Sequence, residues 1–364
     1  MDYPSNGSPL LAHHHTPGSG SSGSGAKAAA TPGAKSVPKG AASGQGKMKF
    51  KVLYTADHLP EQAQKVLVDA HGGFAVDHRP GKGETYFALP GAGILKISAD
   101  LKTVRLLDTP DEVKKSNLHS TRIWSGPDEE VFLVFAANNA GKIFTTTLDG
   151  KLLGTLEAPG ADHDFDNQEV NDYFLGQGNF VPTGVDHLDG RYYVTTGYSN
   201  LDYVLSAKVL RTSPFQAEWS DLAFGGKGDA PGQFGTGHAI TVPPGKKRLD
   251  IADRPHSRIE RFSKYGHFRS MLKLPSGSLP CDIDYLEGYA VVACLEGPDK
   301  SKGAPLYILE KDKLVSSVMP KEELGLTNFV HNHNAVLHKI DGKFYIIAQS
   351  WNPGDFAILE QVAA

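Results

Sequence analysis

Short apolar runs separated by Gly-containing turns repeat along this chain, and this repetition restricts its possible folds more than any other feature. The runs are enriched in Val, Ile, Tyr and Phe and are too short for helices, apart from one short helical pattern at 59–69. Turn dipeptides follow four of them, at Asp189-Gly190, Pro244-Gly245, Glu287-Gly288 and Asp341-Gly342. Such dipeptides between apolar runs are typical of β-hairpins. The chain is therefore expected to fold as a series of antiparallel strands.

Six such units fit the sequence at roughly 40–50 residues each, a period that is typical of propeller blades. The first strands of these units are predicted at 74–77, 121–124, 184–187, 239–242, 283–286 and 335–338. The strand-like run at 49–54 has no local partner, and the last unit shows three clear strands. We therefore predict an all-β, six-bladed β-propeller whose ring is closed by the N-terminal strand, which removes exposed sheet edges.

Residues 1–47 differ in composition from residues 48–364, which are expected to contain the propeller. The first segment is rich in Gly, Ser, Ala and Pro and has almost no large apolar residues. It cannot bury enough surface to offset its ordering entropy, so it is predicted to be a disordered tail. His13, His14 and His15 could bind a metal weakly, but we assign them to this tail. No signal-peptide core is found, so a cytoplasmic location is expected.

Charge and composition argue against several classes of protein. The 37 Lys+Arg and 41 Asp+Glu residues give a formal net charge of −4, so no basic surface points to nucleic acid. No apolar run is long enough to span a membrane. The 2 cysteines are compatible with a reducing compartment. A small molecule or a peptide-like substrate is therefore the expected partner.

Three histidines stand at the same place in alternate units. His119, His238 and His333 each open an apolar first strand, and the same phase gives Thr183 and Cys281 in intervening units. First strands line the central channel of a propeller, so these imidazoles are expected to converge at one level. Three protein ligands with an open position are the arrangement of a catalytic zinc site. Iron and copper also accept imidazole, so zinc is predicted without excluding them.

Counting residue pairs between the first and second strands, outward from the two-residue turns, places the histidines at one face of the ring. Thr183 then lies opposite Thr196, so Tyr198 falls just beyond the second strand, and Cys281 lies opposite Cys294. Starts of first strands and ends of second strands therefore share the functional face. The two cysteines could form a disulfide or line the channel as reduced thiols.

Several stretches resemble a known family. The segments GQFGTGHAI at 232–240 and IADRPHSRI at 251–259 resemble an NHL-type propeller repeat. More narrowly, they resemble the zinc-binding repeat of peptidyl-α-hydroxyglycine α-amidating lyase. The stretches 182–185 and 197–200 are similar to that family's catalytic-tyrosine repeat, and 331–336 is similar to its last histidine repeat.

The resemblance implies a six-bladed propeller that splits a carbinolamide into an amide and glyoxylate. In the family, three histidines hold zinc, a tyrosine acts as base, and an arginine binds the substrate's carboxylate. The matching ligands here are His119, His238 and His333, and the matching base is Tyr198. Arg254 follows a second strand, on the functional face, and is the residue we expect to replace the family's arginine.

Several positions depart from the family's pattern. Gly72 stands in the place of the carboxylate-binding arginine, Ser199 in that of a half-cystine, and Asn334 in that of a calcium-binding aspartate. His331 replaces a methionine and could be a fourth ligand or an outer partner, whereas His71 could replace a ligand if the register shifts. We therefore expect metal binding, but weak or no glyoxylate release from a peptidyl-α-hydroxyglycine. Two further arginines, Arg79 and Arg122, could also bind a substrate anion.

These residues together predict a metal-dependent lyase acting on a hydroxyl-bearing small molecule or peptide-like substrate. Zinc lowers the pKa of a bound hydroxyl or water toward neutrality. A tyrosine is a poor base at its ordinary pKa, but a nearby cation could make Tyr198 effective. A hydrolase using the same metal and a non-catalytic NHL-type propeller that binds a protein or ligand are the alternatives, because fold alone does not separate them. The acidic insertion at 162–172 is expected to overhang the metal face, where it could act as a lid.

Overall fold

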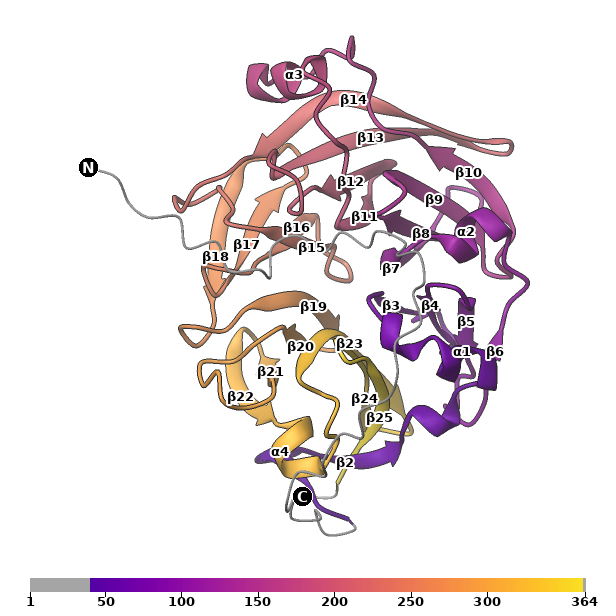
Figure 1. The fold of residues 1–364 in the computed structure, drawn as a ribbon, viewed down its shortest axis with the longest axis vertical. Helices are drawn as coiled ribbons and strands as arrows, with labels where there is room; N and C mark the ends of the chain where they lie inside the picture. The colour runs from indigo at the N-terminus through magenta and orange to yellow at the C-terminus, as the bar shows by residue number, and fades with distance from the viewer. Residues whose placement is uncertain (1–39, 363–364) are drawn as a thin grey trace, which may run out of the picture.

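The structure is a computed structural model that describes residues 40–362. Within that range the strands form six antiparallel sheets arranged as blades around a ring (Figure 1). The first strand of every sheet contacts the first strand of the next, and the sixth contacts the first, so the circle is complete. The prediction of a six-bladed β-propeller is confirmed, and a strand covers each of the six predicted first-strand positions.

Each blade is a hairpin-connected sheet that runs from the channel outward. The first strands are β3 (Phe74–Val76), β7 (Leu118–Ser125), β11 (Gly184–Leu188), β15 (Gly237–Thr241), β19 (Pro280–Leu286) and β23 (His331–Ile340). The second strands are β4 (Thr85–Leu89), β8 (Val131–Ala137), β12 (Arg191–Thr195), β16 (Arg248–Asp253), β20 (Tyr289–Cys294) and β24 (Lys343–Trp351). The third strands are β5 (Gly93–Ile97), β9 (Lys142–Thr147), β13 (Tyr203–Thr212), β17 (Arg258–Ser263), β21 (Leu306–Glu310) and β25 (Asp355–Gln361). The outer strands of the first five blades are β6 (Val104–Leu106), β10 (Leu152–Leu156), β14 (Phe215–Gly225), β18 (Phe268–Lys273) and β22 (Lys313–Val318).

Three of the predicted hairpin turns have two residues, both with positive φ. Asp189, Glu287 and Asp341 have φ of 50°, 50° and 48°, and each is followed by a glycine with positive φ. This backbone matches the right-handed twist of the flanking strands, which is why an acidic residue followed by Gly is so effective there. Pro244-Gly245 instead lies in a longer loop between β15 and β16.

The core consists of apolar layers between adjacent blades. The described residues contain six buried clusters, each shared by two neighbouring sheets. Tyr193, Phe234 and Phe262, for example, fill the layer between the third and fourth blades. Because every blade is packed on both faces, the positions of the first strands around the channel are fixed by the whole ring.

The N-terminal strand closes the ring, as predicted. β2 (Met48–Tyr54) pairs with β25 and becomes the fourth strand of the last blade. The predicted start of the folded chain at residue 48 is too late, because β1 (Ser43–Gln45) pairs with β2. The Ser43 hydroxyl also accepts a hydrogen bond from the Met319 N–H at 2.7 Å. His13, His14 and His15 lie outside the described residues.

Helices in the described range are short and peripheral: α1 (Glu61–Lys65), α2 (Asp111–Lys115), α3 (Gln168–Leu175) and α4 (Pro320–Leu324), with 3-10 turns at Ala56–His58 and Leu67–Asp69. The first of these confirms the helical pattern expected at 59–69. None of the described helices is long and apolar enough to cross a membrane.

The expected lid over the metal face is not found. The acidic insertion leads into α3, which lies beside β14 at the rim of the ring rather than over its centre (Figure 1). Val170 and Phe174 of α3 are buried in the apolar layer of the third blade. Asn167 caps the helix by accepting a hydrogen bond from Val170 N–H at 3.2 Å. The apolar residues of α3, rather than the acidic residues of the insertion, decide where the helix packs.

Candidate metal centre

Irregularities in the first strands place the three predicted histidines. Strand pairing shifts at His119 on β7, at His238 on β15 and at His333 on β23, so each lies in a β-bulge. A fourth shift, on β19, falls at Cys281. Bulges re-aim a side chain relative to the regular alternation of a strand and are common next to functional sites. The predicted pairing of Cys281 with Cys294 is therefore wrong by one residue, because Pro280 is the residue opposite Cys294.

The structure brings these three imidazoles together in the channel. The ring centroids lie 4.7 Å apart for His119 and His238, 4.6 Å for His119 and His333, and 4.9 Å for His238 and His333. Their exposed fractions are only 3%, 1% and 2%. Burial and Arg254 together hold the pKa of His238 well below its ordinary value, so this ring is neutral at neutral pH, as a metal ligand must be.

Backbone carbonyls of the intervening blades hold the Nδ1 atom of each ring. His119 Nδ1 lies 2.6 Å from Thr183 O, His238 Nδ1 lies 2.7 Å from Cys281 O, and His333 Nδ1 lies at the longer distance of 3.4 Å from Gly72 O. A carbonyl can only accept, so Nδ1 carries the proton and Nε2 keeps its lone pair. This is how metal-binding histidines are oriented and fixed in one tautomer.

The Nε2 atoms of His119 and His333 point toward each other and are 3.1 Å apart. His238 Nε2 lies 2.9 Å from the Tyr198 hydroxyl, which is 3.2 Å from His119 Nε2. Two nitrogens bound to one zinc ion at about 2.0–2.1 Å in tetrahedral geometry would be roughly 3.3 Å apart. Two lone pairs facing each other in a buried site repel, whereas a cation between them would be attracted to both. The donor set therefore fits a metal ion.

Two further donors lie beside the predicted three. The ligand atoms of His71, His119 and His333 lie within 4.8 Å of one another, and so do those of His238, Cys281 and His333. The sequence allowed His71 as a replacement ligand if the register shifted. In the structure it is buried against His119 and His333, with ring centroids 4.5 Å and 4.4 Å away. The Asn117 amide nitrogen lies 2.9 Å from His71 Nδ1. With that amide donating, His71 takes the opposite tautomer to the other three and is the poorer ligand.

Tyr198 and Arg254 come from the ends of second strands, on the same face. The Tyr198 hydroxyl lies 3.2 Å from His119 Nε2 and 2.9 Å from His238 Nε2. Arg254 Nη1 is 3.4 Å from the same hydroxyl, and its guanidinium carbon lies 5.2 Å from the centre of the tyrosine ring. Burial raises the pKa of Tyr198 to about 12, an effect that the positive charge of Arg254 opposes. Tyr198 is thus the hydroxyl group that contacts two of the candidate ligands.

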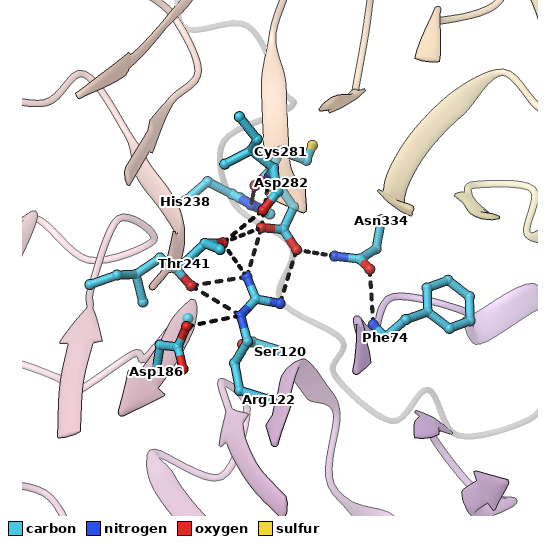
Figure 2. A network of polar contacts seen from close by, with 12 residues as sticks. Phe74, Ser120, Arg122, Asp186, His238, Thr241, Cys281, Asp282 and Asn334 are labelled. Atoms are coloured by element: carbon cyan, nitrogen blue, oxygen red, sulfur yellow. Dashed lines mark hydrogen bonds and ion pairs between the residues drawn. The ribbon is translucent and has the colours of Figure 1, made fainter. Parts of the chain in front are cut away.

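Of the three arginines considered for anion binding, two are engaged elsewhere. Arg122, from β7, donates to both carboxylate oxygens of Asp282 at 2.7 and 3.2 Å and lies 3.6 Å from Asp186 (Figure 2). Arg79 is held by Asp77 at 2.6 Å. Arg254 is 4% exposed, and within residues 40–362 it forms no ion pair with a carboxylate. Of the three arginines, Arg254 is therefore the one that is not paired with a carboxylate among the described residues.

A second polar cluster, around Arg122, lies beside His238 in the channel (Figure 2). Asp282 directly follows Cys281, and Asn334, where the family has its calcium-binding aspartate, donates to Asp282 and accepts from Phe74 N–H at 2.9 Å (Figure 2). The contacts of Arg122 and Asn334 thus link first strands of all six blades, and the Arg122 guanidinium supplies the positive charge beside Asp282. No local pattern in the sequence indicates that these residues meet.

Trp351 and His331 line the same face. Trp351, at the end of β24, lies 5.5 Å from the ring of His71 and 5.7 Å from that of His331. His331 Nδ1 is 3.0 Å from Leu295 O, and His331 belongs to neither of the metal-capable groups. Trp351 was not predicted from the sequence, although it lies at the end of a second strand, the position that indicated Tyr198 and Arg254.

Comparison with known proteins gives a local relationship. No family model matches the chain. A stretch of 93 residues is 30% identical to peptidyl-glycine alpha-amidating monooxygenase A of Xenopus laevis and covers 24% of this chain and 9% of that protein. The chain thus matches less than a tenth of that relative's length.

Solved propeller structures are similar at low identity. A streptogramin B lyase is 14% identical with a TM-score of 0.46, and the match covers 79% of this chain and 92% of that one. Virginiamycin B lyase from Staphylococcus aureus is also 14% identical, with a TM-score of 0.44 and coverage of 80% and 96%. The β-propeller is established by the strand pairing of this chain itself.

Proposed function

We propose that this chain is a metal-dependent lyase of the NHL-propeller type, acting on a hydroxyl-bearing small molecule or a peptide-like substrate. One observation carries the proposal: the ring centroids of His119, His238 and His333 lie within 4.9 Å of one another, and each ring turns Nδ1 to a backbone carbonyl. A propeller that only binds proteins has no need for convergent, buried imidazoles in fixed tautomers. The local similarity to peptidyl-glycine alpha-amidating monooxygenase A supports the same reading.

The residues around the centre suit removal of a proton from a hydroxyl group. A bound zinc ion, or iron or copper in the same ligands, would favour the Tyr198 phenolate and polarise the substrate hydroxyl by its positive charge. Tyr198 is placed to take the hydroxyl proton. The electrons of the O–H bond then form the second bond of a carbonyl group, and the bond from the same carbon to the leaving group breaks. The leaving group departs with that electron pair and gains a proton.

Arg254 is the residue we assign to an anionic group of the substrate. Its guanidinium is buried beside Tyr198 and pairs with no carboxylate among residues 40–362. Gly72, in contrast, cannot supply this function. A Cβ there would lie 2.8 Å from Ala88 O and 2.9 Å from Leu118 O, so the backbone excludes any side chain. We therefore expect little glyoxylate release from a peptidyl-α-hydroxyglycine and better activity on carbinols whose anion reaches Arg254.

Metal analysis tests the proposal directly. Protein purified without chelator should contain about one transition metal ion per chain, as expected for a single centre of this type. His119→Ala, His238→Ala and His333→Ala should each lose it, because each removes one ligand. His267→Ala, at an exposed position, is the matched control and should keep the metal. Wild-type protein without metal would overturn the proposal.

A screen of α-hydroxy amides and related carbinols then separates the two enzyme classes. A lyase forms a carbonyl product without consuming water. A hydrolase at the same centre would place an oxygen atom from labelled water in its product.

A further inference from the structure

Cys281 occupies on the fifth blade the position that the histidines occupy on the second, fourth and sixth. The described first strands have four pairing shifts, which fall at His119, at His238 with Ala239, at Cys281 and at His333. A bulge costs a strand part of its regular pairing and is normally kept for the side chain that it aims. β19 thus has a β-bulge like those of the three strands that carry the histidines, but the residue at the bulge is a cysteine.

The surroundings of the two cysteines differ. The donor atoms of His238, Cys281 and His333 lie within 4.8 Å of one another, and all three residues are buried. Cys294, at the end of β20, pairs with Pro280 beside the bulge and belongs to the apolar layer with Val292 and Tyr307. Both are free thiols. Cys294 has the role expected of a small apolar residue, whereas Cys281 faces nitrogen donors.

We propose that Cys281 is a fourth protein ligand of the metal centre, an inference that rests on the proposed function. A thiol that coordinates a metal is deprotonated by it. Thiolate and imidazole donors select zinc or copper, and they disfavour Mg²⁺, which takes oxygen ligands.

Four protein ligands would complete a tetrahedral site, so one of them must yield when substrate enters. Backbone carbonyls hold the three imidazoles in place. The imidazoles are thus fixed, and we expect Cys281, which lies beside the Arg254 guanidinium, to be the ligand that yields.

Cobalt substitution tests this assignment without any substrate. The metal-free full-length protein is loaded with Co²⁺, and its near-ultraviolet thiolate-to-cobalt charge-transfer absorption is recorded. The wild type and Cys294→Ala should show this absorption. Cys281→Ala should still bind cobalt through the histidines but lack the absorption. Its zinc affinity should fall at least as much as on loss of an outer partner of a ligand, about 10–100-fold.

Each outcome separates the two proposals. Failure of every variant to bind cobalt would refute the metal centre itself. Cobalt bound without charge-transfer absorption, or absorption that survives in Cys281→Ala, would refute only the sulfur ligand. If Cys281→Ala does not fold, X-ray absorption at the zinc edge of the wild type decides. One sulfur neighbour supports the proposal, and nitrogen or oxygen neighbours alone overturn it.

Discussion

Tyr198 is the residue on which the proposed chemistry depends most. Burial raises the pKa of its phenol to about 12, so without further positive charge it holds its proton at neutral pH. Arg254 alone does not reverse this rise. A base role therefore requires the charge of the bound metal, and it predicts that metal removal abolishes activity even where substrate still binds.

Tyr198→Phe separates catalysis from structure at this position. Phenylalanine keeps the ring and removes the hydroxyl that contacts His119 and His238. We expect unchanged metal content and a fall in kcat of about 10²–10⁴, the usual contribution of a general base. Wild-type activity would rule out the base assignment. Loss of metal together with activity would instead assign Tyr198 to holding the ligands.

Asp284 gives the channel a pH-dependent stability. Its partly buried carboxyl accepts from Leu337 N–H at 2.8 Å and lies near Arg122 and Asp282. Burial, its largest influence, raises the pKa from 3.8 to about 7. The folded chain therefore keeps a proton that the unfolded chain releases in this range. The contribution to stability is complete below the unfolded pKa and is lost as the pH rises through the folded pKa.

Asp284→Asn should remove this dependence while keeping an acceptor for the Leu337 N–H. The unfolding free energy of the variant, relative to wild type, should increase between about pH 4 and pH 7, the interval set by the two pKa values. Urea titrations across this range measure it, with the exposed Asp111→Asn as control. A constant difference would show that the carboxyl is already ionised in the folded chain at low pH.

At the scale of elements, the centre depends on how closely the blades approach one another. The turn that carries Tyr198 begins at Gly197, which lies directly against the bulged start of β15. A Cβ at Gly197 would lie 2.4 Å from Gly237 O and 2.8 Å from Gly237 C. Backbone cannot give way as a flexible side chain can. Glycine is therefore required for the hydroxyl of Tyr198 to reach His238.

Gly197→Ala should push the third and fourth blades apart at the metal face. We expect a loss of about 1–3 kcal/mol in unfolding free energy, typical of overpacking, and weaker metal binding. Gly160→Ala is the control, because the nearest atom there is the Asp162 carboxylate at 2.7 Å, the end of a side chain that can move. Wild-type metal affinity in Gly197→Ala would show that the centre tolerates this displacement.

For the whole molecule, ring closure fixes the distances among residues on different blades. The last blade is completed by β2, whose Phe50 is fully buried in the layer between the fifth and sixth blades. Without β2, the edge of β25 would be open and that layer exposed. His119, His238 and His333, on the second, fourth and sixth blades, would then no longer be held at fixed distances from one another.

Two deletions test closure. Removal of residues 1–39, which lie outside the described range, should leave metal content and unfolding unchanged; a fall in metal would point to His13–His15. Removal of residues 1–54 should abolish cooperative unfolding, measured by circular dichroism. Phe50→Ala is a milder version, expected to cost about 3–5 kcal/mol. A stable, metal-binding protein lacking residues 1–54 would contradict the role of β2 in closing the ring.

The sequence by itself determined the architecture and the equivalent positions of the three histidines. Strand positions follow from local apolar runs, and the turn at Asp189-Gly190 follows from the residues that tolerate positive φ. The shared phase of His119, His238 and His333 follows from the repeat, since equivalent positions in a closed ring lie at one level. Each of these properties depends on residues close together in the chain.

Only the tertiary structure decided what surrounds these three histidines. The bulge at Cys281, the approach of His71 and the pairing of Arg122 with Asp282 each depend on strands from different blades. No local pattern encodes such contacts, because they form only when the apolar layers pack and the ring closes. The fold class could therefore be predicted from short-range periodicity, whereas the full donor set of the centre required the closed ring.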